Sequence, residues 1–291
     1  MTSSGATEPT AAERLGTVVG GRYKLVSLLG EGGLALVFAA DDLTDGRRVA
    51  LKLLKREEAN DPLVIARFER EAGAMQALAH EHIVAALGFG RSPEGEMCLV
   101  MEHVEGETLR TLLKRVRQPP LLETLEIARQ MALGLTRAHG LGIVHRDLKP
   151  ENVMVTWREP GRPHVKILDF GMARLLTGRQ GAALTRRGAV FGTPEYMAPE
   201  QAMGLPVDER ADQYSFGVML FELLAGGRPF SATSVLEMLQ KHIRETPPKL
   251  RVVAPGTPPA IEAAVERMMA KDPAARFPSV EAAAAAFAAR Q

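Results

Sequence analysis

The chain has 291 residues, of which 46% are hydrophobic and 24% are charged, so it can build an ordinary globular core. Its formal net charge of +1 argues against nucleic acid or a membrane surface as the main partner. A single cysteine, Cys98, excludes a disulfide within the chain and fits a reducing, cytoplasmic compartment. We expect no membrane segment in this chain, because no stretch is long and apolar enough to span a bilayer.

The first hundred residues predict a small sheet with one helix. Residues 1–20 lack the apolar region of a secretory signal and are expected to form a flexible tail. The runs "YKLVSLL", "LALVFAA" and "RVALKLL" read as strands, with a hairpin signal at Asp45-Gly46 before the third. Asp61-Pro62 is a helix start with Asp as N-cap, and that helix should reach about Ala79. The runs "HIVAALGFG" and "MCLVMEHV" complete a five-stranded antiparallel sheet.

After Gly106 the periodicity becomes helical. The runs "TLRTLLKRV" and "LLETLEIARQMALGLTRAHG" predict two helices, and "DQYSFGVMLFELLAG", "SVLEMLQKHI" and "AIEAAVERMMA" predict three more. Two short strands, "NVMVTW" and "HVKILDF", surround the turn "REPGRP". A small β-rich half followed by a larger helical half predicts an α+β, bilobal protein with a cleft around Met101–Gly106.

Two charged residues of the first half stand in apolar surroundings. Lys52 shares one face of its strand with Ala50 and Leu54. Glu71 lies within the apolar stripe of the first predicted helix. Each charge needs a partner of opposite sign, so we expect the two side chains to pair across the interface between helix and sheet. The pair is either a purely structural salt bridge or part of a site.

The cluster "LGEGGLALVF" supports the second possibility. Its glycines, Gly30, Gly32 and Gly33, allow the backbone to approach a ligand and present N–H groups to phosphate. This signal alone is weak, because many tight turns share it. Lys52, about twenty residues further on, is a candidate cation for such phosphates.

The stretch "IVHRDLKPENVMV" concentrates polar groups between two apolar ends. Asn152 precedes one predicted strand of the "REPGRP" hairpin and Asp169 follows the other, so both should lie at the same end of the hairpin. An amide oxygen and a carboxylate there suit Mg²⁺ beside phosphates. Asp147 can accept a proton from an incoming hydroxyl, and Lys149 can neutralise the transferred group.

These stretches resemble the motifs of protein kinases. "HRDLKPEN" is similar to the catalytic loop, "LDFG" to the magnesium motif and "VALK" to the third-strand lysine of that family. "GTPEYMAPE", "DQYSFG" and "KDPAARFP" resemble later motifs, and all six occur in the family's order from about Tyr23 to Ala289. "RFEREAGAMQALAHEHIV" and "APEQAMG" are most similar to bacterial Hanks-type serine/threonine kinases.

The resemblance implies a protein kinase domain over residues 21–291, with a small lobe at 21–103 and the hinge and large lobe at 104–291. It implies ATP and Mg²⁺ as cofactors and Ser/Thr hydroxyls of proteins as substrates. It gives catalytic roles to Asp147, Lys149, Lys52 and Glu71, metal binding to Asn152 and Asp169, and an ion pair to Glu200 and Arg276. The residues it places around ATP are Leu29, Gly30, Glu31, Gly32, Gly33, Val37, Ala50, Lys52, Met101, Glu102, Val104 and Met154.

One position departs from the family pattern, since Ala35 replaces the third glycine of the loop; we expect altered phosphate clamping at most. His145 is expected to be structural and to stack near Phe170. Two other functions remain open. A pseudokinase would have lost Lys52, Asp147 or Asp169, and a small-molecule kinase would not need the "GTPEYMAPE" segment.

A regulatory site is also predicted. Arg146 directly precedes Asp147, and in kinases with this arginine a phosphate on the activation segment usually becomes its partner. Thr185 lies mid-way through that segment and is the expected site of autophosphorylation, with self-association as one route to it. The alternative is an unmodified, solvated loop threonine.

Overall fold

A computed structural model describes residues 10–55, 58, 61–170 and 194–288, apart from the side chains at 67, 71, 158 and 288. The chain divides into two compact units. Unit 1 comprises residues 1–79 and 84–104, and unit 2 comprises residues 80–83 and 105–291. Each unit has its own core and is described by itself.

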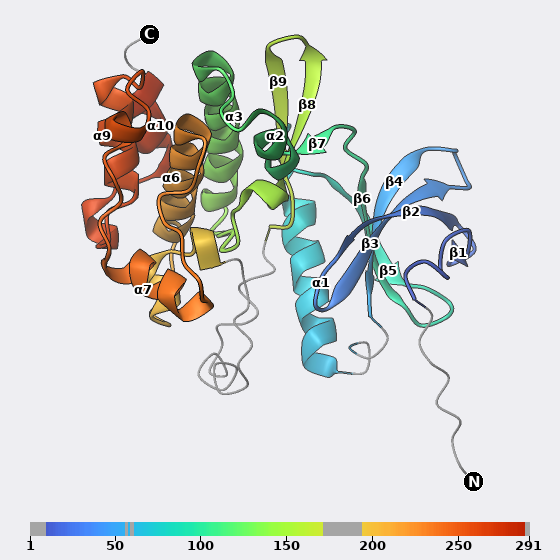
Figure 1. Cartoon of the computed structure of the whole chain (residues 1–291). Coiled ribbons are helices and arrows are strands. Elements are labelled where there is room, and N and C mark those ends of the chain that lie inside the picture. The colour runs from blue at the N-terminus through green and yellow to red at the C-terminus, as the bar shows by residue number, and fades with distance from the viewer. Residues whose placement is uncertain (1–9, 56–57, 59–60, 171–193, 289–291) are drawn as a thin grey trace. The chain divides into compact units, whose positions relative to one another are not determined.

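Unit 1 contains an antiparallel sheet and the helix α1 (Pro62–Ala77) (Figure 1). The strand order is β1-β2-β3-β4-β6-β5. The strands are β1 (Val18–Val19), β2 (Tyr23–Glu31), β3 (Ala35–Asp42), β4 (Arg48–Leu54), β5 (Ala86–Arg91) and β6 (Met97–Glu102). The sheet therefore has six strands rather than the five predicted, because the short β1 pairs with the start of β2.

The start of α1 agrees with the sequence. Asp61 is the N-cap, and its Oδ1 accepts a hydrogen bond of 2.8 Å from the backbone N–H of Leu63. Pro62 occupies the first helical position, where its missing N–H costs nothing. The helix ends at Ala77, two residues earlier than expected. Phe68 of α1 packs against Phe89 of β5 with ring centroids 5.8 Å apart, which fixes the helix on one face of the sheet.

Residues 10–20 are not the flexible tail that the sequence predicted. The guanidinium of Arg14 forms an ion pair of 2.9 Å with Glu96 and lies over the ring of Phe38. The backbone N–H of Gly16 donates to the carbonyl of Leu25. These contacts cover the apolar core on the sheet face opposite α1, and composition alone does not reveal them because partners such as Glu96 lie far along the chain.

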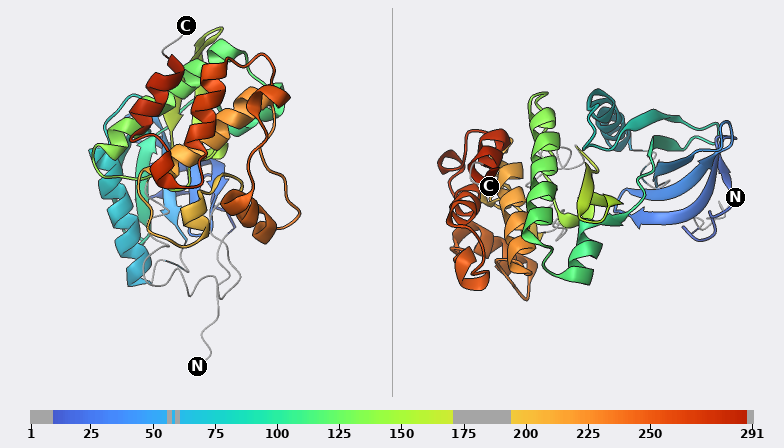
Figure 2. Two further views of the ribbon diagram at one scale, coloured as in Figure 1. Left: turned by 90° about the vertical axis from the view of Figure 1, so that its left-hand side faces the viewer. Right: turned by 90° about the horizontal axis from the view of Figure 1, so that it is seen from above.

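Unit 2 is mainly helical (Figures 1 and 2). A three-stranded sheet has the order β7-β8-β9, with β7 at Glu107–Thr108, β8 at Val153–Glu159 and β9 at Arg162–Ile167. The longer helices are α2 (Leu109–Val116), α3 (Leu121–His139), α6 (Arg210–Ala225), α7 (Val235–Arg244), α9 (Pro259–Met268) and α10 (Val280–Ala288). Shorter helical segments are η1 (Pro150–Asn152), η4 (Pro194–Tyr196), α5 (Pro199–Ala202), α8 (Leu250–Val253) and η5 (Pro273–Ala275). No helix within these described ranges is long and apolar enough to cross a membrane.

The helix α6 forms the centre of unit 2. All residues from Ala211 to Leu224 are buried, so the helix is enclosed on every side rather than amphipathic. It packs against α3, α8 and α9. Gly217 permits the contact with α9, since a Cβ there would come within 2.9 Å of the Met268 side chain. Asp212 and Glu222 on this helix therefore need partners within the protein.

A buried histidine makes the stability of unit 2 sensitive to acid. Burial, followed by the nearby charge of Lys271, lowers the pKa of His242 from 6.5 to about 4. As the pH falls below 6.5, His242 therefore becomes protonated in the unfolded chain before it does so in the folded protein, and this difference favours unfolding. We expect His242 to reduce the free energy of unfolding by about 2 kcal/mol between pH 7 and pH 5. Urea denaturation of the wild type and of His242→Gln at both pH values measures this loss, and the variant should show a smaller one. Equal losses in the two proteins would contradict the assignment.

Candidate active site

The loop from His145 to Asn152 resembles the catalytic loop of kinases, is called the catalytic loop below, and brings three predicted residues together. The Nζ of Lys149 donates a hydrogen bond of 2.6 Å to Oδ2 of Asp147. The amide nitrogen of Asn152 donates to the carbonyl of Asp147 at 2.8 Å. Both Asp147 and Lys149 keep part of their side chains exposed, so a carboxylate and an ammonium stand side by side at the surface of unit 2.

His145 holds the loop in place and has no exposed surface, as the structural prediction for it requires. Its Nδ1 accepts from the backbone N–H of Asp147 at 3.3 Å, so Nε2 carries the proton and donates to the carbonyl of Leu168 at 2.8 Å. Its ring meets the buried ring of Phe170 edge-on, with centroids 4.8 Å apart. The expected stacking of His145 near Phe170 is confirmed.

Asp212 anchors the same loop from α6. Its carboxylate accepts from the backbone N–H groups of His145 and Arg146, each at 2.7 Å, and lies 2.8 Å from Nε2 of His139. Burial raises the pKa of Asp212, but these hydrogen bonds outweigh burial and hold it below the ordinary value. A permanent negative charge inside the helix core therefore fixes the backbone that carries Asp147.

The β8–β9 hairpin brings Asp169 to this loop. Val153 pairs with Ile167 at the end of the hairpin, and the backbone N–H of Leu168 donates to the carbonyl of Asn152 at 2.9 Å. Asp169 follows directly and has a positive φ of 54°. A non-glycine residue in this conformation carries backbone strain, which persists where the surrounding structure imposes it. The prediction that Asn152 and Asp169 lie at one end of the hairpin is confirmed.

This end of the hairpin suits a magnesium ion. The amide nitrogen of Asn152 is turned to the Asp147 carbonyl, which directs the amide oxygen away from it. Amide and carboxylate oxygens are the ligands that Mg²⁺ takes from proteins, usually one or two together with phosphate and water.

The residues predicted around ATP lie in unit 1, except for Met154 on β8 of unit 2. Lys52 is 2% exposed on β4, opposite Val37 of β3 and Leu99 of β6. The side chain of Glu71 lies outside the described structure, so its pairing with Lys52 stays a prediction. Ala50 and Met101 are buried, and Glu102 accepts a hydrogen bond from the backbone of Ala85. The remaining residues of this set are Leu29, Gly30, Glu31, Gly32, Gly33 and Val37 on and beside β2 and β3, and Val104 after β6.

Ala35 does not strain the glycine-rich turn. The backbone N–H of Gly32 donates to the carbonyl of Ala35 at 2.9 Å and closes the turn between β2 and β3. Ala35 is buried at the start of β3, and its φ is not positive. The backbone at this position therefore does not require a glycine.

The predicted pair of Glu200 and Arg276 is present in the helical unit. Two parallel hydrogen bonds of 2.7 and 2.9 Å join the guanidinium to the carboxylate, and both side chains are buried. Gln201, the next residue of α5, donates to the carbonyl of Arg146 at 2.8 Å. The ion pair therefore supports a helix that contacts the catalytic loop.

A cluster around Arg110 was not predicted. This α2 residue donates to Glu151 of the catalytic loop and to Glu222 of α6, each at 2.8 Å, and it also contacts the hydroxyl of Tyr196, which donates to Glu222. One guanidinium thus joins α2, the catalytic loop, η4 and α6. The one feature of the sequence that pointed to this cluster is Glu222, because a carboxylate within the apolar run "VMLFELLAG" must pair with a cation.

Loss of Arg110 should weaken the catalytic loop. We expect Arg110→Gln to lower the free energy of unfolding by about 2 kcal/mol, because Glu222 stays buried without its cation. Turnover should fall about tenfold as Glu151 loses its anchor. Arg115→Gln is the matched control on the same helix, since Arg115 pairs with Glu107 at an exposed position. Equal effects of the two variants on unfolding and turnover would contradict this role.

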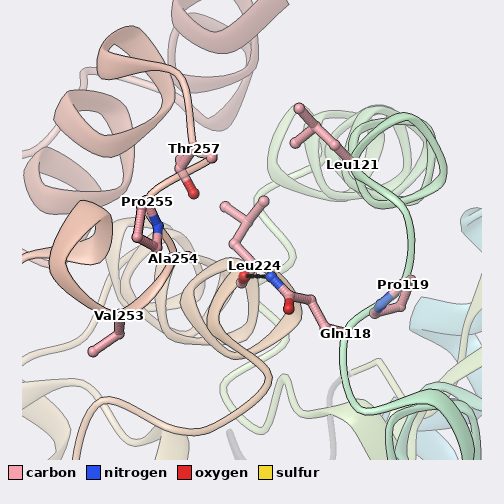
Figure 3. A pocket seen from close by; sticks show the side chains of 9 residues that line it. Gln118, Pro119, Leu121, Leu224, Val253, Ala254, Pro255 and Thr257 are labelled. Carbon is pink, nitrogen blue, oxygen red and sulfur yellow. Dashed lines mark hydrogen bonds between the residues drawn. The ribbon is translucent and has the colours of Figure 1, made fainter.

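A hollow beside α2 and α3 is separate from this site (Figure 3). It has a volume of about 260 Å³ and lies between Gln118 and Pro119, which precede α3, and the segment from Val253 to Thr257. The side-chain amide of Gln118 donates to the carbonyl of Leu224 across it. None of the predicted site residues lines it.

Comparison with known proteins agrees with this geometry. The family described as "Protein kinase domain" matches residues 23–288. The chain belongs to the protein kinase family. The serine/threonine-protein kinase pkn3 of Myxococcus xanthus is 40% identical over 279 residues, which cover 94% of this chain and 51% of the relative. PknA of Mycobacterium tuberculosis is 40% identical over 286 residues, which cover 96% of this chain and 64% of the relative.

A solved structure confirms the kinase fold. The PknI kinase domain of Mycobacterium tuberculosis has a TM-score of 0.70 and 28% identity, with 95% of this chain and 98% of that chain covered. These relatives also confirm the resemblance to bacterial serine/threonine kinases. The chain spans about half to two thirds of the length of pkn3 and PknA, which therefore contain further regions.

Proposed function

We propose that this chain transfers the γ-phosphoryl group of ATP to serine or threonine hydroxyls of proteins. The observation that carries the proposal is the meeting of Asp147, Lys149, Asn152 and Asp169 at one end of the β8–β9 hairpin. Phosphoryl transfer needs positioning and neutralisation of charge rather than a covalent intermediate. A carboxylate that accepts a proton, a cation and two oxygen ligands for a metal supply those needs.

Each side chain has a defined task in this mechanism. Asp147 accepts the proton of the attacking hydroxyl, and Lys149 neutralises charge on the transferred group. Asn152 and Asp169 would hold Mg²⁺, which supplies neutralisation of the phosphate oxygens when bound. Lys52, paired with Glu71, would contact the α- and β-phosphates beneath Gly30, Gly32 and Gly33. The backbones of Glu102 and Val104 would bind adenine, with Leu29, Val37, Ala50, Met101 and Met154 around the ring.

Three features favour serine and threonine over tyrosine. Lys149 stands two residues after Asp147, and tyrosine kinases usually have a different pattern there. The relatives pkn3 and PknA are named serine/threonine kinases. Thr193 of "GTPEY" points to the same substrate class, although it lies outside the described residues.

Incubation with radiolabelled ATP, Mg²⁺ and casein tests the proposal. We expect label on serine and threonine of casein, no label without Mg²⁺, and no label with Lys52→Met. Absence of transfer with intact nucleotide binding would indicate a pseudokinase. Transfer to small hydroxyl compounds but not to protein would indicate a small-molecule kinase.

Autophosphorylation of Thr185 is a second, regulatory part of the proposal. Thr185 lies outside the described residues, whereas Arg146, the proposed partner of its phosphate, is held by Asp212 and Gln201. We expect mass spectrometry after incubation with Mg·ATP to find phosphate on Thr185, and Thr185→Ala to lower activity about tenfold. Thr177→Ala serves as the control within the same segment. An unmodified Thr185 in the fully active enzyme would contradict this part.

A further inference from the structure

Unit 1 contains a hollow that the proposed function does not use. It has a volume of about 470 Å³, within the range of about 300–1,000 Å³ typical of small-molecule sites. It opens on the sheet face opposite α1, where Tyr23, Val49, Cys98 and Val100 form an apolar floor continuous with the core. At one edge the turn at Gly20 lies against the β5–β6 turn. A Cβ placed on Gly20 would lie 3.7 Å from the side chains of Ser92 and Pro93.

Two glycines within β5 keep this hollow open. Gly88 pairs with Val100, and Gly90 pairs with Cys98. Directly opposed residues of an antiparallel pair project on the same face, so side chains at 88 and 90 would enter the hollow. Glycine inside a strand weakens the strand and often marks a place where a ligand approaches the backbone closely. A Cβ at Gly90 would meet nothing within 4 Å among the described residues.

Arginines outnumber carboxylates along the lining of the hollow. Arg22, Arg47 and Arg91 line it together with one carboxylate, Asp42, while the Glu94 carboxylate is hydrogen-bonded to Ser92 and Gly20 at one edge. Asp42 holds Arg22 in a fixed orientation through two hydrogen bonds of 2.9 and 2.6 Å. Arg47 is engaged with Asp45, whereas no described carboxylate lies within ion-pair distance of the exposed Arg91. The charge available to a ligand therefore comes from Arg91 and from the remaining N–H groups of Arg22.

We propose that this hollow binds a free, single-chain amphiphile with one anionic head group, of the kind represented by a medium-chain carboxylate. The chain would cover Val49, Cys98 and Val100 in the space left by Gly88 and Gly90. The head group would lie between Arg22 and Arg91. An apolar floor alone would accept any oily molecule, and the arginines make the site selective for an anion.

Isothermal titration calorimetry of the whole chain with decanoate, below its critical micelle concentration, tests the proposal. We expect saturable binding of one molecule, about tenfold weaker binding of decanol and no binding of decyltrimethylammonium. Affinity should rise from hexanoate through octanoate to decanoate, because each added methylene is buried. Equal affinity for decanoate and decanol would overturn the proposal, and so would the absence of binding.

Two substitutions locate the site. Gly90→Val should weaken decanoate binding at least about tenfold by filling the hollow, and its β-branched side chain suits a strand, so the fold should persist. Arg91→Gln should weaken binding about tenfold, whereas Arg48→Gln, beside the hollow but not lining it, should not. Unchanged affinity in the folded Gly90→Val variant would overturn the assignment. Sedimentation that shows self-association lost in Gly90→Val, without decanoate binding, would assign this face to a second copy and also overturn it.

Discussion

Asp147→Asn should lower kcat by about a hundred- to ten-thousand-fold, with the Kd for ATP changed by less than about threefold. The substitution removes the proton acceptor but keeps one side-chain oxygen, so the contacts with Lys149 and Asn152 can persist. The loop itself is held by Asp212 through the backbone of His145 and Arg146, not through the Asp147 side chain. The loss should therefore appear in the chemical step.

Steady-state kinetics and ATP titration of the purified variant measure the two quantities separately. Asp208→Asn is the matched control, because it makes the same change at an exposed turn before α6 and should leave kcat within about twofold. A parallel loss of kcat and ATP affinity in Asp147→Asn would give Asp147 a structural role instead. Wild-type turnover in that variant would remove it from the mechanism.

Glu200→Gln should lower the free energy of unfolding by about 3–5 kcal/mol, the largest effect that we expect on stability. Arg276 would remain buried with its charge uncompensated, because its other contacts are the carbonyls of Ala270, Arg210 and Lys271 and the ring of Tyr214. Removing one partner lowers the free energy of unfolding by more than the intact ion pair contributes to it, because the remaining charge stays buried away from water.

Chemical denaturation of the single variants and of the double variant Glu200→Gln, Arg276→Met separates the contribution of the ion pair from the cost of an unpaired buried charge. The double variant should be more stable than Glu200→Gln alone, since no buried charge remains. Glu266→Gln, which loses an exposed pair with Lys249, should change stability by less than about 0.5 kcal/mol. A Glu200→Gln protein as stable as the control would show that the buried pair has no structural importance. Activity should fall with stability, because α5 contacts the catalytic loop through Gln201.

The main departures from the sequence analysis have physical causes. Residues 10–20 were predicted to be a flexible tail because their partners lie far along the chain: Arg14 pairs with Glu96, 82 positions away, and lies over the ring of Phe38. The cluster of Arg110, Glu151, Glu222 and Tyr196 joins residues as far as 112 positions apart in the chain. No local pattern predicts such a pairing, although Glu222 within an apolar helix shows that a partner must exist.

Local sequence rules suffice for the order of the main strands and helices, the N-cap of α1 at Asp61 and the residues that converge at the β8–β9 hairpin. These depend on local rules, namely alternation, helical period, capping and the geometry of a hairpin, which act between near neighbours in the chain. Long-range packing is needed to show how Asp212 anchors the loop, which cation neutralises Glu222, and that Gly88 and Gly90 leave a hollow above Val100. Those contacts join segments distant in sequence, and burial rather than local preference selects them.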